Sequence, residues 1–368
     1  MKITSIKAYV IRIPLTEEFR IALGASRFHE GVITEIHTDE GIIGYGEGVP
    51  SRRITGETLD STASLISRVG ETIVGRDPLD YRDIIHGVEN SILGNTAAKA
   101  SIDLALFDIV SKSHGLPLKA FLGKKSGNRF ETSITIGIMD KKHAVEKAFK
   151  LVEMGARILK IKIGLDPSSD VERVLSIRKA VGEDIKIRLD ANQGYTPKQA
   201  IRVLRRLENA DIEFCEQPVH WRDLDGMRHV RVHTEIPIMA DESVHSPRDV
   251  IDLIRHDAAD MVNIKIMKAG GILNAIKIAD ICEAAGLVCQ IGCMSETRIA
   301  IAAGLHLAIA LDIIKYSDLD GYMLLKEDIA SGVEFADSAN IIGGDPGLGV
   351  HINRASLEKH SIKTISLG

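Results

Sequence analysis

The sequence lacks the features that mark secreted, membrane-spanning and nucleic-acid-binding proteins. It has only four cysteines in 368 residues, and none has C-x-x-C spacing, which argues against a zinc site or a disulfide framework. No apolar run is long enough to cross a membrane, and the first residues, MKITSIKAYVIRIPL, lack the apolar core of a signal peptide. The net charge is −5 with no basic patch, which argues against a nucleic-acid partner. We therefore expect a cytoplasmic globular protein.

The first third of the chain reads as strands followed by helices. Residues 2–12, 31–38 and 41–45 are strand candidates, and the turn signal Asp39-Glu40-Gly41 predicts a three-stranded antiparallel sheet. The segment 15–30 has mixed polarity and is interpreted as a loop. Helical periodicity covers residues 58–74 and 96–114, and Gly115-Leu116-Pro117 ends the second helix. Residues 1–125 therefore predict an α+β capping domain.

From about residue 132 the pattern changes to regular alternation of strand and helix. Thr196-Pro197 and Ser246-Pro247 each combine an N-cap with a proline at the first helical position. The expected strands are 132–137, 158–163, 185–190, 212–216, 237–241, 261–265, 288–292 and 313–318. Eight such units predict an α/β fold, a (β/α)8-type barrel over residues 126–325. We expect the glycine-rich tail, 326–368, to be irregular and to return to the capping domain.

Three carboxylates end successive strands of the expected barrel. Asp190, Glu216 and Asp241 are spaced by 26 and 25 residues, one βα unit each. Because the carboxyl ends of barrel strands converge on one mouth, these groups should meet there and repel one another. A hard divalent cation resolves that repulsion, and a set of oxygen donors alone favours Mg²⁺, with Mn²⁺ second. Taken singly, each carboxylate could instead be a helix cap or a turn residue.

Lysines complete this constellation. Lys160 and Lys162 lie two residues apart on one expected strand, so their side chains point the same way. Mutual repulsion and burial should lower their pKa values toward those of a base, unless the strand is a solvated edge guarded by lysines. Lys265 ends the sixth strand, opposite the second. A metal-held carboxylate between Lys162 and Lys265 predicts proton transfer at an α-carbon through an enediolate that Lys160 and the metal stabilise.

The motifs together resemble a known family. KIK at 160–162, DAN at 190–192, EQP at 216–218, ADES at 240–243 and NIKIMKAGG at 263–271 resemble the enolase superfamily, muconate-lactonizing-enzyme subgroup. The resemblance covers essentially the whole chain. It implies that Asp190, Glu216 and Asp241 are Mg²⁺ ligands, that Lys162 and Lys265 are the acid/base pair, and that Lys160 lowers the pKa of Lys162. Lys268 is the competing candidate for the sixth-strand base.

The eighth strand narrows the choice within this subgroup. Asp318 and Asp320 point to the same side and would clamp a free ammonium group, an element that looks like that of dipeptide epimerases. The alternative is a pair of surface loop aspartates. By the same resemblance, the residues in position to touch substrate are Cys293, Met294 and Ser295, and Thr135 and Ile54 are either pocket walls or ordinary packing. The sequence thus predicts an isomerase that epimerises dipeptides, with a small-molecule dipeptide as partner, and we expect a homo-oligomer.

One position departs from the family pattern. Family members acting on Ala-Glu carry an arginine in the first-domain loop, and the matching residue here is Gly24; Arg20 and Arg27 flank it and either could substitute. The dipeptide is therefore left open. The alternative enzymes are a muconate-type cycloisomerase, an o-succinylbenzoate synthase and an N-acylamino-acid racemase with the same lysines and metal. A third hypothesis is that the protein is not an enzyme but a metal-bound barrel that serves as a binding or structural protein.

Overall fold

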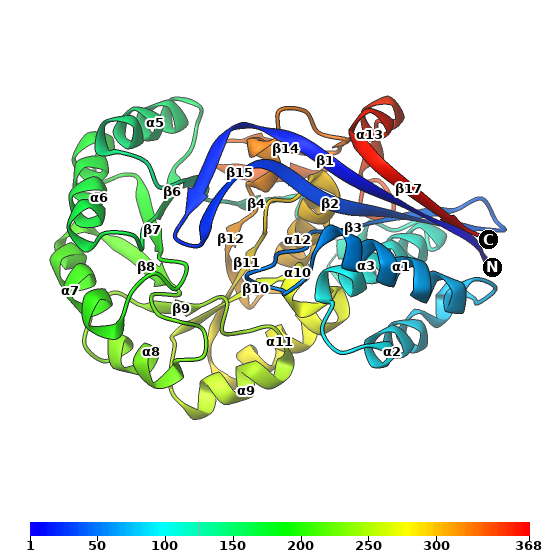
Figure 1. The fold of residues 1–368 in the computed structure, drawn as a ribbon, viewed down its shortest axis with the longest axis horizontal. Helices are drawn as coiled ribbons and strands as arrows, with labels where there is room; N and C mark the ends of the chain where they lie inside the picture. The colour runs from blue at the N-terminus through cyan, green and yellow to red at the C-terminus, as the bar shows by residue number, and fades with distance from the viewer. Residues whose placement is uncertain (125) are drawn as a thin grey trace.

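The computed structural model describes residues 1–124 and 126–368, so the predicted domain boundary at residue 125 falls on the one residue outside these ranges. A four-stranded antiparallel sheet forms the core of the capping domain, in the order β17-β1-β2-β3. Its strands are β1 (Ile3–Ile21), β2 (Gly24–Thr38), β3 (Ile43–Gly48) and β17 (Ser361–Leu367). The fourth strand, which the sequence did not predict, comes from the far end of the chain, and the two termini lie side by side in Figure 1.

The segment 15–30 is not a loop, contrary to the sequence interpretation. β1 continues to Ile21 and β2 begins at Gly24, so the two strands form a long hairpin whose end pairs Ile21 with Gly24. The alternation of apolar and polar residues that marks a strand is weak here for two reasons. The register shifts between Pro14 and Phe19, and most of the side chains near the tip are at least partly exposed. Figure 1 shows this hairpin reaching from the capping sheet across to the strands of the barrel.

The predicted helices of the capping domain are confirmed as α1 (Leu59–Ile73) and α3 (Thr96–Ser113). Between and after them lie three elements that were not predicted, a 3-10 turn η1 (Pro78–Asp80), α2 (Tyr81–Ser91) and α4 (Leu118–Phe121). The buried helix α3 lies directly against β3. A Cβ atom on Gly46 would stand 1.8 Å from the Ser101 carbonyl oxygen, so only glycine permits this approach of helix to strand.

The alternating part of the chain forms eight parallel strands that are hydrogen-bonded in sequence order, which confirms the predicted barrel. They are β5 (Ile134–Ile136), β6 (Ile158–Lys162), β7 (Lys186–Asp190), β8 (Ile212–Glu216), β9 (Ile238–Ala240), β10 (Met261–Lys265), β11 (Val288–Gly292) and β12 (Ile314–Asp318). The surrounding helices are α5 (Lys141–Glu153), α6 (Pro167–Val181), α7 (Pro197–Leu207), α8 (Leu224–Arg231), α9 (Pro247–Arg255), α10 (Ile266–Ala269), α11 (Ile272–Ala285) and α12 (Arg298–Ala310), with a 3-10 turn η2 (Glu208–Ala210) after α7.

The barrel closes at a seam between β5 and β12 that side chains help to bridge. The Ser133 N–H donates to the Ser317 carbonyl at 3.2 Å, and the Leu319 N–H donates to Thr132 Oγ1 at 2.8 Å. In addition, Ser133 Oγ donates to Asp318 Oδ1 at 3.1 Å. The seam therefore holds the end of β12, and with it Asp318, in a defined position at the barrel mouth.

The tail is not irregular, as the sequence suggested, but contains short strands and a helix. These are β13 (Ala330–Ser331), β14 (Val333–Ala336), β15 (Ala339–Ile342), β16 (His351–Ile352) and α13 (Arg354–His360), preceded by a 3-10 turn η3 (Gly321–Leu324). Strand β15 pairs with β4 (Arg129–Glu131), and β17 pairs with β1 of the capping sheet. Strands of two to four residues are too short to carry a visible period, which explains the miss.

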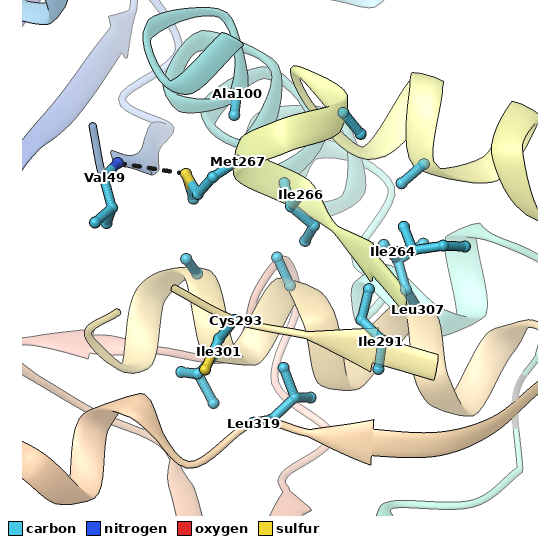
Figure 2. Packing of buried hydrophobic residues seen from close by; sticks show 14 of the residues in the cluster. Val49, Ala100, Ile264, Ile266, Met267, Ile291, Cys293, Ile301, Leu307 and Leu319 are labelled. Atoms are coloured by element: carbon cyan, nitrogen blue, oxygen red, sulfur yellow. Dashed lines mark hydrogen bonds between the residues drawn. The ribbon is translucent and has the colours of Figure 1, made fainter. Parts of the chain in front are cut away.

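The capping domain and the barrel share one packed interface. Figure 2 shows Val49 of the capping domain beside Met267, with its N–H directed at the sulfur atom of that methionine at 3.4 Å. The buried carboxylate of Glu47 accepts from the N–H groups of Thr297 and Ala300 at 2.9 and 3.1 Å, which caps the barrel helix α12 from the other domain. These contacts fix the capping sheet over the barrel mouth.

Within the part of the chain that the structure describes, no helix is both long and apolar enough to cross a membrane.

Candidate active site

The two lysines of β6 point into the barrel. Lys160 is 1% and Lys162 is 7% exposed, and β6 lies between β5 and β7, so the solvated edge strand is excluded. Lys160 Nζ lies 2.5 Å from Asp318 Oδ2, 2.8 Å from Glu216 Oε2 and 3.0 Å from Asp190 Oδ2. The ammonium of Lys160 is thus the hub of a buried ionic cluster.

The three predicted carboxylates meet, as their spacing required. Asp190 and Glu216 end β7 and β8, and Asp241 directly follows β9. One oxygen from each lies within 4.8 Å of the others, and all three side chains are buried. Burial and then the charge of Asp190 raise the pKa of Glu216 to about 8. An all-oxygen set under this repulsion fits a hard divalent cation, so these residues can hold one.

The prediction that burial and repulsion lower the lysine pKa values is wrong for Lys160. Burial does act in that direction, but Asp190, Asp318 and Glu216 together raise the pKa of Lys160 well above its ordinary value. Asp241 and then Glu216 likewise outweigh burial and raise the pKa of Lys265. Sequence spacing placed the lysines on one strand face, but it did not show how closely each one approaches a carboxylate of another strand.

Lys162 and Lys265 face the same cavity from opposite sides of the barrel. Lys162 Nζ lies 2.6 Å from Asp190 Oδ2, and Lys265 Nζ lies 2.7 Å from Asp241 Oδ2. Both side chains line the cavity between barrel mouth and capping domain. Lys268 is different, because its Nζ lies 2.6 Å from Asp241 Oδ1, it is 1% exposed, and it does not line that cavity. The geometry therefore favours Lys265 over Lys268 as the group that meets a substrate.

Asp318, the last residue of β12, and Asp320, two residues further on, also face the cavity. Asp318 is bound to Lys160, and Asp320 Oδ2 accepts from the Thr135 N–H at 2.6 Å. Burial and then the neighbouring Asp318 raise the pKa of Asp320 to about 6. A second cation placed between the two carboxylates would relieve their repulsion. The reading of Asp318 and Asp320 as surface loop aspartates is excluded, since they are 4% and 5% exposed.

The cavity has a volume of about 280 Å³ and lies under the β1–β2 hairpin. Of the predicted substrate-binding residues, those that line it are Thr135, Ile54, Cys293, Met294, Ser295, Asp318 and Asp320. Gly24 at the hairpin tip does not line it. Arg20 and Arg27, the proposed substitutes for an arginine there, both bind the carboxylate of Glu18, at 3.1 and 3.0 Å.

Sequence reasoning missed several polar groups of the site. Asn263 Nδ2 donates to Glu216 Oε1 at 2.8 Å and Gln290 Nε2 donates to Glu216 Oε2 at 3.4 Å, which orients this carboxylate. Both could have been identified from the sequence, because side chains two residues apart on a strand share a face, and each of these lies two residues before the end of its strand at the barrel mouth. His29 lines the cavity and its Nε2 lies 3.4 Å from Glu47 Oε1. No pattern indicated it, because its segment was interpreted as a loop.

This chain is similar in both sequence and fold to known epimerases and racemases. The chain is 40% identical to the L-Ala-D/L-Glu epimerase of Clostridium acetobutylicum, over 92% of this chain and 96% of that one. It is 42% identical to the hydrophobic dipeptide epimerase of Enterococcus faecalis, over 95% and 99% of the two chains. The Enterococcus enzyme in complex with Mg and L-Leu-L-Tyr superposes with a TM-score of 0.91.

The N-succinyl Arg/Lys racemase of Bacillus cereus is similar in fold, with a TM-score of 0.97, 36% identity and full coverage of both chains. These relatives are epimerases and racemases, so the prediction of an isomerase is confirmed. Family models match residues 5–123, as the mandelate racemase/muconate lactonizing enzyme N-terminal domain, and residues 143–356, as the enolase C-terminal domain-like region. The chain therefore belongs to the enolase superfamily.

Proposed function

We propose that this protein is a Mg²⁺-dependent dipeptide epimerase that inverts the α-carbon of the C-terminal residue. The observation that carries the proposal is a cavity with a lysine on each of two opposite strands, a carboxylate triad beside them and an aspartate pair at one end. Relatives about 40% identical to this chain are epimerases of L-Ala-D/L-Glu and of hydrophobic dipeptides. Mn²⁺ is the second choice of cation, since it accepts the same oxygen donors.

The two ends of the dipeptide are held by opposite charges. Asp190, Glu216 and Asp241 would hold the divalent cation, which would supply charge to bind and polarise the substrate's carboxylate. Asp318 and Asp320 receive the free α-ammonium at the other end. With both ends held, the α-carbon of the second residue is positioned between the lysines.

Lys162 and Lys265 exchange the proton on opposite faces of that carbon. One lysine, in its neutral form, removes the α-proton, and the ammonium of the other returns a proton to the opposite face, which inverts the centre. Removal of the proton transfers negative charge to the substrate carboxylate, and Lys160 stabilises that charge as a fixed cation. The ion pairs of Lys162 with Asp190 and of Lys265 with Asp241 hold both amines beside the metal ligands.

The remaining predicted residues form the wall around the dipeptide. Cys293, Met294 and Ser295 follow β11, and Thr135 lies on β5 next to the aspartate pair. Ile54 reaches the cavity from the capping domain. Its carbonyl oxygen lies 3.0 Å from Nε2 of His245, a residue of the barrel. We propose that these side chains set the fit of the substrate, while the lysines and carboxylates carry out the chemistry.

The test is solvent exchange at the α-carbon. An L,L-dipeptide library is incubated with the protein and Mg²⁺ in ²H₂O, and deuterium at the C-terminal α-carbon is followed by NMR and mass spectrometry. We expect incorporation together with formation of the L,D diastereomer. The matched control is the double variant Lys162→Ala/Lys265→Ala, which retains the triad. Absence of deuterium at that carbon for every dipeptide would refute the proposal.

A racemase of N-acylated amino acids is the second candidate. The observation that favours it is the ion pair between Asp318 and Lys160, which already supplies a cation to one member of the aspartate pair. The N-succinyl Arg/Lys racemase of Bacillus cereus also matches this fold closely. The two functions differ in Asp318→Asn, which should weaken turnover of a dipeptide but leave turnover of an N-succinyl amino acid unchanged.

A further inference from the structure

We infer that the C-terminal residue of the substrate carries an apolar side chain, and that the capping domain selects it. The inference rests on the proposed function and names the substrate class of that site. Its evidence is the chemical character of the cavity wall above the lysines, the absence of a usable cation in that wall, and the conformation of the β1–β2 hairpin around Gly24.

The chemistry at the α-carbon leaves one direction for the side chain. Of the four substituents of that carbon, the carboxylate faces the triad, the amide nitrogen leads toward Asp318 and Asp320, and the proton faces one of the two lysines. All of these groups belong to the barrel. The remaining substituent therefore points out of the barrel mouth, toward the part of the cavity that the capping domain covers.

That part of the cavity is mainly apolar. The capping-domain side chains that supply its apolar wall are Leu15, Phe19, Ile21, Phe28, Val49 and Ile54. Phe28 is 39% exposed, and the guanidinium of Arg12 lies over its ring, 4.2 Å from the centroid. A substrate side chain packed against the part of Phe28 that lines the cavity would cover apolar surface, which is favourable by about 25 cal/mol per Å².

The wall offers no cation to an acidic side chain. Among the described residues that line the cavity, the only lysines or arginines are Lys162 and Lys265, each already beside a carboxylate of the triad. The ionisable groups that the capping domain contributes are Glu30 and the buried His29. The carboxylate of Glu30 is paired with Arg12, whose Nε lies 3.4 Å from Glu30 Oε1, and Arg12 itself does not line the cavity. Burial lowers the pKa of His29 to about 4, so it is neutral.

Arg53 is the strongest candidate for the opposite reading. Its Nη1 lies 2.9 Å from the place where a Cβ on Gly24 would stand, and the φ angle of Gly24 is +142°, which side-chain-bearing residues rarely adopt. The guanidinium therefore rests over the hairpin tip where a residue-24 side chain would begin. It is exposed and does not line the cavity. The cation thus stays at the rim, outside the apolar wall.

The experiment compares four dipeptides that share the N-terminal residue, namely L-Ala-L-Leu, L-Ala-L-Ala, L-Ala-L-Glu and L-Ala-L-Lys. Values of kcat/KM for α-deuterium incorporation are measured with Mg²⁺ for the native protein, Arg53→Gln, and the neighbouring control Arg52→Gln. We expect L-Ala-L-Leu to exceed L-Ala-L-Ala by about tenfold, and L-Ala-L-Glu by about a hundredfold or more, in all three proteins.

Two wall variants test the same point from the protein side. Ile54→Thr keeps the branched shape but adds a hydroxyl group, and Phe28→Ala removes a partly exposed ring. Each should lower the Leu-to-Ala ratio of kcat/KM several-fold while circular dichroism stays native, an effect that a general loss of structure would not produce.

A preference for L-Ala-L-Glu that Arg53→Gln removes would overturn the inference, and so would a preference for L-Ala-L-Lys. Either result would leave the proposed function intact, because deuterium would still enter a dipeptide. Absence of exchange with all dipeptides would refute both.

Discussion

The choice between Lys265 and Lys268 as the sixth-strand base can be decided by a pair of single substitutions. Both lysines contact the carboxylate of Asp241, at 2.7 and 2.6 Å, so their electrostatic influence on this group is similar. They differ in access, because only Lys265 lines the cavity. Removing a general base typically costs about 10²- to 10⁴-fold in rate, which corresponds to about 3–5 kcal/mol of barrier.

We therefore expect Lys265→Ala to lose epimerisation by at least that factor at saturating Mg²⁺, while retaining exchange on the face that Lys162 serves. Lys268→Ala should need more Mg²⁺ to reach full activity, because its ammonium helps to hold Asp241. The assay follows deuterium uptake from each of the two diastereomers separately. Full epimerisation by Lys265→Ala, with none by Lys268→Ala at any Mg²⁺ concentration, would refute the reasoning.

Three further predictions concern binding and stability. Because the pKa of Asp320 is about 6, its carboxyl becomes neutral as pH falls through 6, so KM for a dipeptide should rise about tenfold per pH unit below 6, and Asp320→Asn should lose this dependence in steady-state kinetics. Mg²⁺ at 100 times the Kd of the native protein should add about 2.7 kcal/mol to the free energy of unfolding, measured by urea denaturation. An equal gain in Asp190→Asn at that same Mg²⁺ concentration would contradict the assigned triad. Glu47→Ala should cost about 1–3 kcal/mol in the same assay, because the N–H groups of Thr297 and Ala300 lose their buried acceptor, and no change would show that water replaces it.

Much of this protein could be read from its sequence because the relevant signals are local and periodic. Strand and helix alternate at nearly constant spacing after residue 132, which requires a parallel sheet and, with eight strands, a barrel. The same spacing brings Asp190, Glu216 and Asp241 to one edge. Alternation along β6 places Lys160 and Lys162 on one face, since neighbouring strand residues point to opposite sides.

The shape of the capping domain was decided by contacts between distant parts of the chain. The hairpin over residues 15–30 was mistaken for a loop, because its partly exposed tip has no clear apolar face. Strand β17 was missed because it becomes part of a sheet only by pairing with β1, from Ile6 with Leu367 to Ile11 with Ser361, at the other end of the chain. The buried link from Glu47 to Thr297 has no signature in either segment alone.

The sequence by itself determined the barrel and which carboxylates and strand lysines meet at its mouth, because that depends only on where each residue lies in its strand. The tertiary structure decided the pKa values of the site residues and which side chains line the cavity. It showed that Lys160 is held by three carboxylates, so that its pKa rises where spacing had suggested a fall. It also placed Arg53 over Gly24 at the rim of the cavity. Such effects depend on distances of a few ångströms between side chains of different elements, which the order of residues along a chain does not specify.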